Sequence, residues 1–173
     1  MPRTPYVLIC ATIAMLATAP NAARAQNGLE LMGYGFRAGA SLDDELTQFL
    51  VGGHLDLGRP YDSLRVQTVI TAGFGDDAFS FLLGGEAHYL FPVSATSSIE
   101  PYAGGGIGLH HINRDRHRDD DRGRDDDTTE AALLLVAGFD VPASRWWGYF
   151  VEGRFLVADE SVFRLEGGVT WLY

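Results

Sequence analysis

Serine and histidine are the residues of this chain that could act as a nucleophile and its base. Ser80 and His88 share one face of an alternating segment. At about 3.3 Å per residue of extended chain, the eight-residue offset separates them by roughly 26 Å, which is far beyond hydrogen-bond reach. No other serine and histidine form a pair by proximity in the sequence, so we expect the protein not to be an enzyme.

Metal and thiol chemistry are limited in the same way. His110 and His111 are adjacent, so on a strand their side chains point to opposite faces and cannot bind one metal together. We expect both at a water interface. Cys10 is the only cysteine and lies in the apolar N-terminal stretch, which leaves the rest of the chain without a disulfide or a thiolate site. No cofactor is expected.

The polar run 113–129 (NRDRHRDDDRGRDDDTT) is of low complexity, which predicts a disordered and solvated loop tip. Its arginines would suit phosphate groups and its aspartates a divalent cation. The spacing matches no EF-hand loop, so any metal site would be weak and irregular. The candidate ligands are Asp119, Asp120, Asp121, Asp125, Asp126 and Asp127.

Residues 1–25 have the features of a signal peptide. Arg3 supplies a positive start, residues 6–17 are apolar, and Ala23-Arg24-Ala25 forms a cleavage site. The apolar stretch is shorter than the roughly 20 residues of a transmembrane helix. We therefore expect residues 26–173 to form one exported domain.

The chain is acidic, with a formal net charge of −10, and loss of Arg3 and Arg24 with the signal peptide makes the charge −12. The phosphates of a nucleic acid would repel such a protein, so no nucleic-acid partner is expected.

Apolar residues recur at a period of two from Leu31 onward, in segments of about ten residues that turn-forming residues interrupt. Each segment has one apolar face and one polar or small face. The sixth is apolar on both faces, so its register rests on Glu130 and Asp140 alone. The eight segments are 32–42, 48–57, 64–74, 79–91, 99–110, 130–141, 147–157 and 163–173.

A soluble barrel would turn the apolar face inward, and a membrane barrel would turn it outward and gather aromatic residues at both strand ends. If the chain starts on the periplasmic side, the aromatics fall into two such girdles. The inner girdle comprises Tyr34, Phe36, Tyr89, Phe91, Trp147, Tyr149, Trp171 and Tyr173, and the outer girdle comprises Phe49, Phe74, Phe79, Phe81, Phe155 and Phe163. We therefore expect an all-β fold, an eight-stranded antiparallel up-and-down transmembrane β-barrel.

The opposite face of the strands would fill the narrow lumen of such a barrel. Charged groups there can pair with one another and bind trapped water, which they could not do in lipid. The expected lumen charge network comprises Arg37, His54, Asp56, Arg65, Glu86, His88, Glu100, Glu152, Arg154, Arg164 and Glu166.

The connections are consistent with this topology. Periplasmic turns should be short and external loops longer. The turns at 58–63, 91–98 and 142–145 carry the proline and glycine of tight connections, and the long run 113–129 falls on the external side.

Three stretches carry a family resemblance: 84–89 (GGEAHY), 101–108 (PYAGGGIG) and 165–173 (LEGGVTWLY). They resemble the small outer-membrane barrels of the OmpA, OmpX and OmpW type and the outer membrane protein β-barrel domain family. The resemblance implies a location in the bacterial outer membrane, with its lipids and lipopolysaccharide as partners. An aromatic last residue resembles the family's signal to the barrel-assembly machinery, which implies this role for Trp171 and Tyr173. Most members end in phenylalanine, from which Tyr173 departs.

The expected function is that of a monomeric outer-membrane barrel with a structural or surface-interaction role. A porin-like alternative is a narrow OmpW-like channel for small apolar molecules, because eight strands leave no wide pore. A lipid A-modifying enzyme is a distant alternative, since the required catalytic motif is missing.

Overall fold

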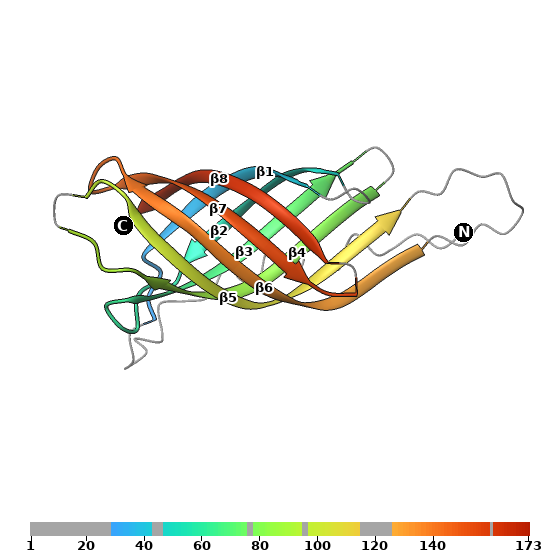
Figure 1. Ribbon diagram of the computed structural model, residues 1–173, viewed down its shortest axis with the longest axis horizontal. Coiled ribbons are helices and arrows are strands. Elements are labelled where there is room, and N and C mark those ends of the chain that lie inside the picture. Colours follow the sequence, from blue (N-terminus) through green and yellow to red (C-terminus); the bar gives the residue numbers. More distant parts are fainter. Residues whose placement is uncertain (1–28, 43–46, 76–77, 95–96, 115–125, 160) are drawn as a thin grey trace, which may run out of the picture.

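The structure, a computed structural model, describes residues 29–42, 47–75, 78–94, 97–114, 126–159 and 161–173. Eight strands form a closed barrel in which each strand pairs antiparallel with its neighbours in sequence, and β1 closes the ring against β8 (Figure 1). The predicted eight-stranded antiparallel barrel is therefore confirmed. The strands are β1 Gly33–Ser41, β2 Phe49–Asp56, β3 Leu64–Phe74, β4 Ala78–Leu90, β5 Glu100–Arg114, β6 Asp126–Pro142, β7 Trp147–Val157 and β8 Val162–Leu172.

In the described ranges, the polar groups are positioned by strands. The described part of the chain contains no helix that is long and apolar enough to cross a membrane.

The strands β5 and β6 are longer than their apolar alternation predicts. Asn113 pairs with Asp127 and Arg114 with Asp126, so both ends of the predicted 113–129 loop belong to the sheet. Antiparallel pairing uses backbone groups and does not need apolar side chains, which explains why the sequence pattern ended too early. As a result, β5 and β6 reach beyond most other strands at the right of Figure 1.

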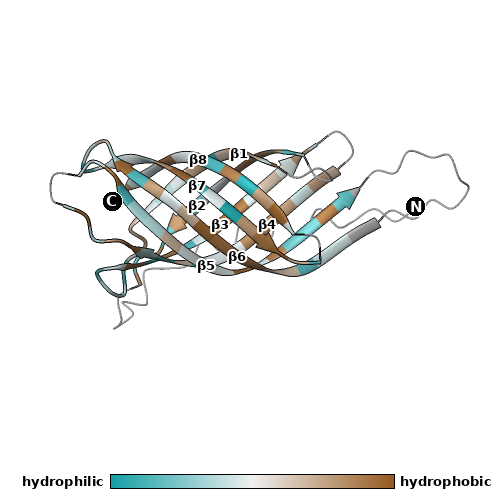
Figure 2. Cartoon of the chain, viewed as in Figure 1, coloured by the Kyte–Doolittle hydropathy of each residue, from teal (hydrophilic) through white to brown (hydrophobic). Residues whose placement is uncertain are grey.

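The barrel carries its polar side chains inside and its apolar side chains outside. On β8, for example, Arg164 and Glu166 are 1% and 2% exposed, whereas Phe163 and Leu165 are 40% and 48% exposed. The same alternation appears along the other strands as changes of hydropathy from residue to residue (Figure 2). This polarity is the reverse of that expected for a soluble barrel with an apolar core.

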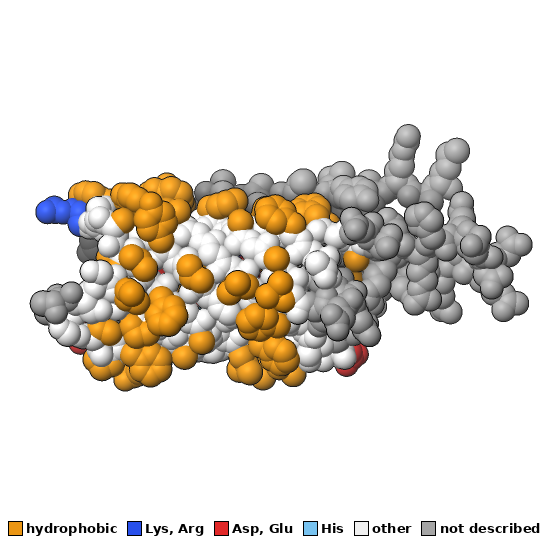
Figure 3. Space-filling view, turned by 45° about the horizontal axis from the view of Figure 1, so that its top comes forward, with side chains coloured by type: hydrophobic (Ala, Val, Ile, Leu, Met, Phe, Trp, Pro, Cys, Tyr) orange, Lys and Arg blue, Asp and Glu red, His pale blue; other side chains and the backbone are white. Residues whose placement is uncertain are grey.

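The outward apolar side chains gather in two bands separated by a paler zone (Figure 3). Among the predicted inner-girdle residues, Tyr34 stacks on Trp171 at 5.7 Å and Trp147 meets Tyr149 edge to face. Among the predicted outer-girdle residues, the rings of Phe74 and Phe79 lie 5.5 Å apart. The predicted girdle residues are exposed or half-exposed on the outside of the barrel.

The connections differ from expectation in one respect. Only the connection that includes 115–125 is clearly longer at the predicted external end. The link between β3 and β4 is a tight turn, in which the Gly75 N–H donates to the Ala78 carbonyl at 2.9 Å. Loop length is therefore a weak guide to sidedness in this chain. The connections at that end are 42–48, 75–77, 115–125 and 158–161, and those at the other end are 57–63, 91–99 and 143–146.

Inward-facing glycines let β4 and β5 lie close together. A Cβ added at Gly104 would meet the Ala87 carbonyl oxygen, and one added at Gly106 would meet the Gly85 carbonyl oxygen. These positions face the crowded lumen, whereas a Cβ at the outward Gly85 would meet no atom within 4 Å. The glycines of β5 thus make room for the large charged side chains described next.

Candidate functional site: the charged lumen

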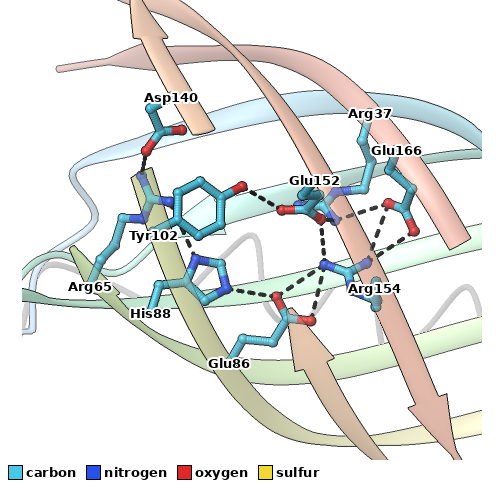
Figure 4. A network of polar contacts seen from close by, with 9 residues as sticks. All are labelled: Arg37, Arg65, Glu86, His88, Tyr102, Asp140, Glu152, Arg154 and Glu166. Carbon is cyan, nitrogen blue, oxygen red and sulfur yellow. Dashed lines mark hydrogen bonds and ion pairs between the residues drawn. The ribbon is translucent and has the colours of Figure 1, made fainter. Parts of the chain in front are cut away.

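Arg154 lies at the centre of the lumen and is completely buried. Its Nη2 atom lies 2.7 Å from Glu152 Oε1 and 3.0 Å from Glu86 Oε1, and its Nη1 atom lies 3.2 Å from Glu166 Oε1 (Figure 4). The three carboxylates come from β4, β7 and β8. One guanidinium therefore ties together strands from different sides of the barrel.

Arg37 of β1 provides the second cation of this cluster. Its Nη1 atom lies 2.7 Å from Glu152 Oε1 and 3.0 Å from Glu166 Oε2. Its guanidinium also lies over the Phe150 ring, 5.2 Å from the centroid. Buried charges are tolerated when they are paired and hydrogen-bonded, and these contacts meet that condition for the three glutamates.

A second set of contacts extends this cluster toward the predicted periplasmic mouth. His88 Nε2 lies 3.1 Å from Glu86 Oε2, and its Nδ1 lies 3.3 Å from Arg65 Nη2. The His88 ring stacks on Tyr102 at 4.9 Å, and the Tyr102 hydroxyl donates to Glu152 Oε2 at 2.7 Å. The last contact of this set joins Arg65 Nη1 to Asp140 Oδ2 at 2.6 Å. Figure 4 shows these side chains converging from opposite walls, so they fill the lumen at this height.

Like charges face each other across the β7–β8 pair. Glu152 is the register partner of Glu166, and Arg154 is the register partner of Arg164. Such cross-strand pairs are destabilising on their own. Here the two glutamates are compensated by Arg154 of β7 and by Arg37 of β1, each of which contacts both carboxylates.

Arg164 differs from the other lumen arginines. It is 1% exposed, and its one hydrogen-bond partner among the described residues is His110, with Arg164 Nη2 3.0 Å from His110 Nε2. Its Nε and Nη1 atoms are buried without a hydrogen-bond partner. The Arg164 guanidinium thus contacts no carboxylate among the residues that the structure describes.

His110 and His111 point to opposite faces, but the expectation that both lie at a water interface is wrong for His110. His110 is fully buried, because its position follows the inward alternation of β5. His111 faces outward and its Nδ1 lies 2.8 Å from the Thr129 hydroxyl.

The remaining members of the predicted network have separate partners. His54 contacts the Thr170 hydroxyl at 3.0 Å, Asp56 accepts the Gly58 N–H at 2.8 Å, and Glu100 is half-buried at the mouth. Sequence reasoning left Tyr102 and Asp140 out of the network. Both occupy inward positions of their alternating segments, which was the signal available for including them.

The other candidate residues do not assemble into a site. Ser80 donates to Gln48 Oε1 at 2.5 Å at the predicted external end, away from His88. The described residues contain no group of three or more histidine, cysteine or acidic side chains placed to hold a metal. The signal peptide and Asp119, Asp120, Asp121 and Asp125 lie outside the described residues, and Asp126 and Asp127 begin β6.

An open cavity of about 80 Å³ lies at the mouth of the barrel, at the end with the inner girdle. Asp56, Arg59, Arg65, Glu100 and Asp140 line it together with residues of β7 and β8. In this cavity, the charged interior meets the rim of the outward apolar surface.

Comparisons with known proteins identify the class of fold. No protein-family model matches the chain, and no curated protein matches it either. Among solved structures, Neisserial surface protein A matches with a TM-score of 0.63 and 16% identity, over 82% of this chain and 96% of that one. The N-terminal β-barrel domain of Pseudomonas aeruginosa OprF matches with a TM-score of 0.64 and 12% identity, over 83% and 98%.

A third similar structure is Ail, the attachment invasion locus protein of Yersinia pestis, with a TM-score of 0.55 and 12% identity, over 86% of this chain and 100% of that one. At these identities the likeness concerns the fold. The chain has the fold of the small eight-stranded barrels of bacterial outer membranes.

Proposed function

We propose that this protein is an integral outer-membrane barrel with a structural or surface-interaction role and no catalytic activity. The observation that carries the proposal is the reversed polarity of the barrel. A ring of buried arginines and glutamates inside, with exposed leucine, phenylalanine and tyrosine outside, suits a chain whose solvent is lipid.

The lumen contacts favour a role at the membrane surface over one in conduction. Arg37, Arg154 and their three glutamates fill the lumen at mid-height, and Leu82, Leu134 and Leu156 form a buried apolar cluster inside the same barrel. A narrow OmpW-like channel would need these side chains to move apart. The names of two similar structures, a surface protein and an attachment protein, support the same choice.

The first experiment is cell fractionation combined with a heat-modifiability gel, on which a folded barrel migrates differently before and after boiling. We expect the protein in the outer-membrane fraction with a clear shift. Recovery in the soluble periplasm without a shift would contradict the proposal.

Two further measurements separate the alternative functions. We expect no single-channel conductance from the folded protein in planar bilayers, whereas a discrete conductance would favour the channel. We also expect identical lipid A mass spectra from cells with and without the protein. A change in the acyl chains of lipid A would favour the enzyme.

A further inference from the structure

The mouth cavity retains two carboxylates that no cation of the described residues neutralises by direct contact. Asp56 is 6% exposed and uses one carboxylate oxygen to accept the Gly58 N–H. Glu100 is half-buried and lines the same cavity. Asp140, by contrast, is held by Arg65 at 2.6 Å. The cavity thus offers a partly desolvated place for a positively charged hydrogen-bond donor.

The same cavity has a positive residue at its edge. Arg59 lies in the connection between β2 and β3, lines the cavity and is exposed. A ligand that satisfies both features carries an ammonium group and an anionic group a few bonds apart. A bare divalent cation would leave Arg59 without a role, and the described residues form no metal-binding cluster.

The cavity is continuous with the membrane-facing surface. Trp147 and Tyr149 line it, and these residues also face outward at the inner girdle, where Tyr149 is 49% exposed. Aromatic residues with polar ends favour the level of lipid headgroups. A molecule anchored in this cavity can therefore extend its acyl chains along the outside of the barrel.

We propose that the mouth cavity binds the headgroup of a phospholipid with a primary ammonium, such as phosphatidylethanolamine. The ammonium lies against Asp56 and Glu100, and the phosphate lies against Arg59. The site rests on the proposed function, because it requires this end of the barrel to lie at a phospholipid leaflet.

The test is native mass spectrometry of the folded barrel in detergent, titrated with phosphatidylethanolamine, phosphatidylcholine and phosphatidylglycerol of identical acyl chains. Phosphatidylcholine keeps both charges but has no N–H donor, and phosphatidylglycerol has no cation. We expect about tenfold preference for phosphatidylethanolamine, the effect of one charge-assisted hydrogen bond. Equal binding of the three lipids would overturn the proposal.

Variants locate the site. Glu100→Gln and Arg59→Gln should each weaken binding of phosphatidylethanolamine by about threefold to tenfold, as expected for partly exposed charge pairs. Asp159→Asn removes the same charge at the opposite end of the barrel and should leave binding unchanged. Wild-type binding by both mouth variants would overturn the proposal.

Two controls separate the possible failures. Soluble phosphoethanolamine should bind much more weakly than the lipid. Equally tight binding would overturn the lipid proposal, because the ligand would then be the free headgroup. The heat-modifiability shift reports on the barrel itself. Loss of that shift would contradict the proposed function together with the lipid site, whereas a normal shift without lipid preference would overturn the lipid site alone.

Discussion

Replacing Arg154 by methionine tests the lumen network most directly. Arg154 is fully buried and contacts Glu86, Glu152 and Glu166. Arg154→Met therefore leaves Glu152 and Glu166 with Arg37 alone and leaves Glu86 with His88 and no guanidinium partner. Methionine has a similar length, so loss of packing contributes little. Removal of one partner from a buried ion pair costs about 3–5 kcal/mol, and we expect a destabilisation in this range.

Arg164→Met is the matched control. Arg164 is as deeply buried, but it contacts His110 and no carboxylate of the described residues, and it faces Arg154 across the β7–β8 pair. Its removal relieves a desolvated charge and a like-charge contact. We expect the free energy of unfolding to stay within about 1 kcal/mol of the wild type or to rise.

The assay is urea-induced unfolding of each variant in phospholipid vesicles, followed by tryptophan fluorescence and by the gel shift. The reasoning requires a lower unfolding midpoint for Arg154→Met than for Arg164→Met. Equal losses for the two variants would mean that lumen water, rather than the ion pairs, compensates these charges.

Three further predictions concern single contacts, and the same unfolding assay measures them. Tyr102→Phe removes the donor to Glu152 Oε2 and should cost about 1–3 kcal/mol, while Tyr149→Phe on the outer surface should cost less than about 0.5 kcal/mol. Ile107→Arg places a charge on an outward side chain that is 74% exposed and should cost about 2–4 kcal/mol in vesicles, a loss that a water-facing surface would not produce. Gly106→Ala should prevent the gel shift because its Cβ meets the Gly85 carbonyl, whereas Gly85→Ala should fold normally.

Much of the barrel could be predicted from the sequence because the side-chain period of a strand is strict. The bounds of β3 and β7 match the alternating segments 64–74 and 147–157. For β6, apolar on both faces, Glu130 and Asp140 alone gave the correct inward register, as their pairing with His110 and Glu100 shows.

The parts of the structure that could not be predicted from the sequence also have a physical cause. The ends of β5 and β6 depend on backbone pairing between polar residues, which leaves no hydrophobic signal. Individual partners inside the lumen depend on how the ring closes, and this brings Arg37 of β1 to Glu152 of β7. Alternation could indicate that these residues face inward, but it could not indicate which charges meet.

The like-charged cross-strand pairs of β7 and β8, Glu152–Glu166 and Arg154–Arg164, affect how these strands reach their register. A slip of two residues removes both like-charge pairs and, depending on its direction, places either Glu152 opposite Arg164 or Arg154 opposite Glu166, with every side chain still on its correct face. An isolated β7–β8 hairpin should therefore prefer the slipped alignment, which is locally better. The native alignment becomes favourable only when β1 and β4 supply Arg37 and Glu86. The last hairpin is thus locally frustrated, and its correct pairing is decided late, by strands at the beginning and middle of the chain.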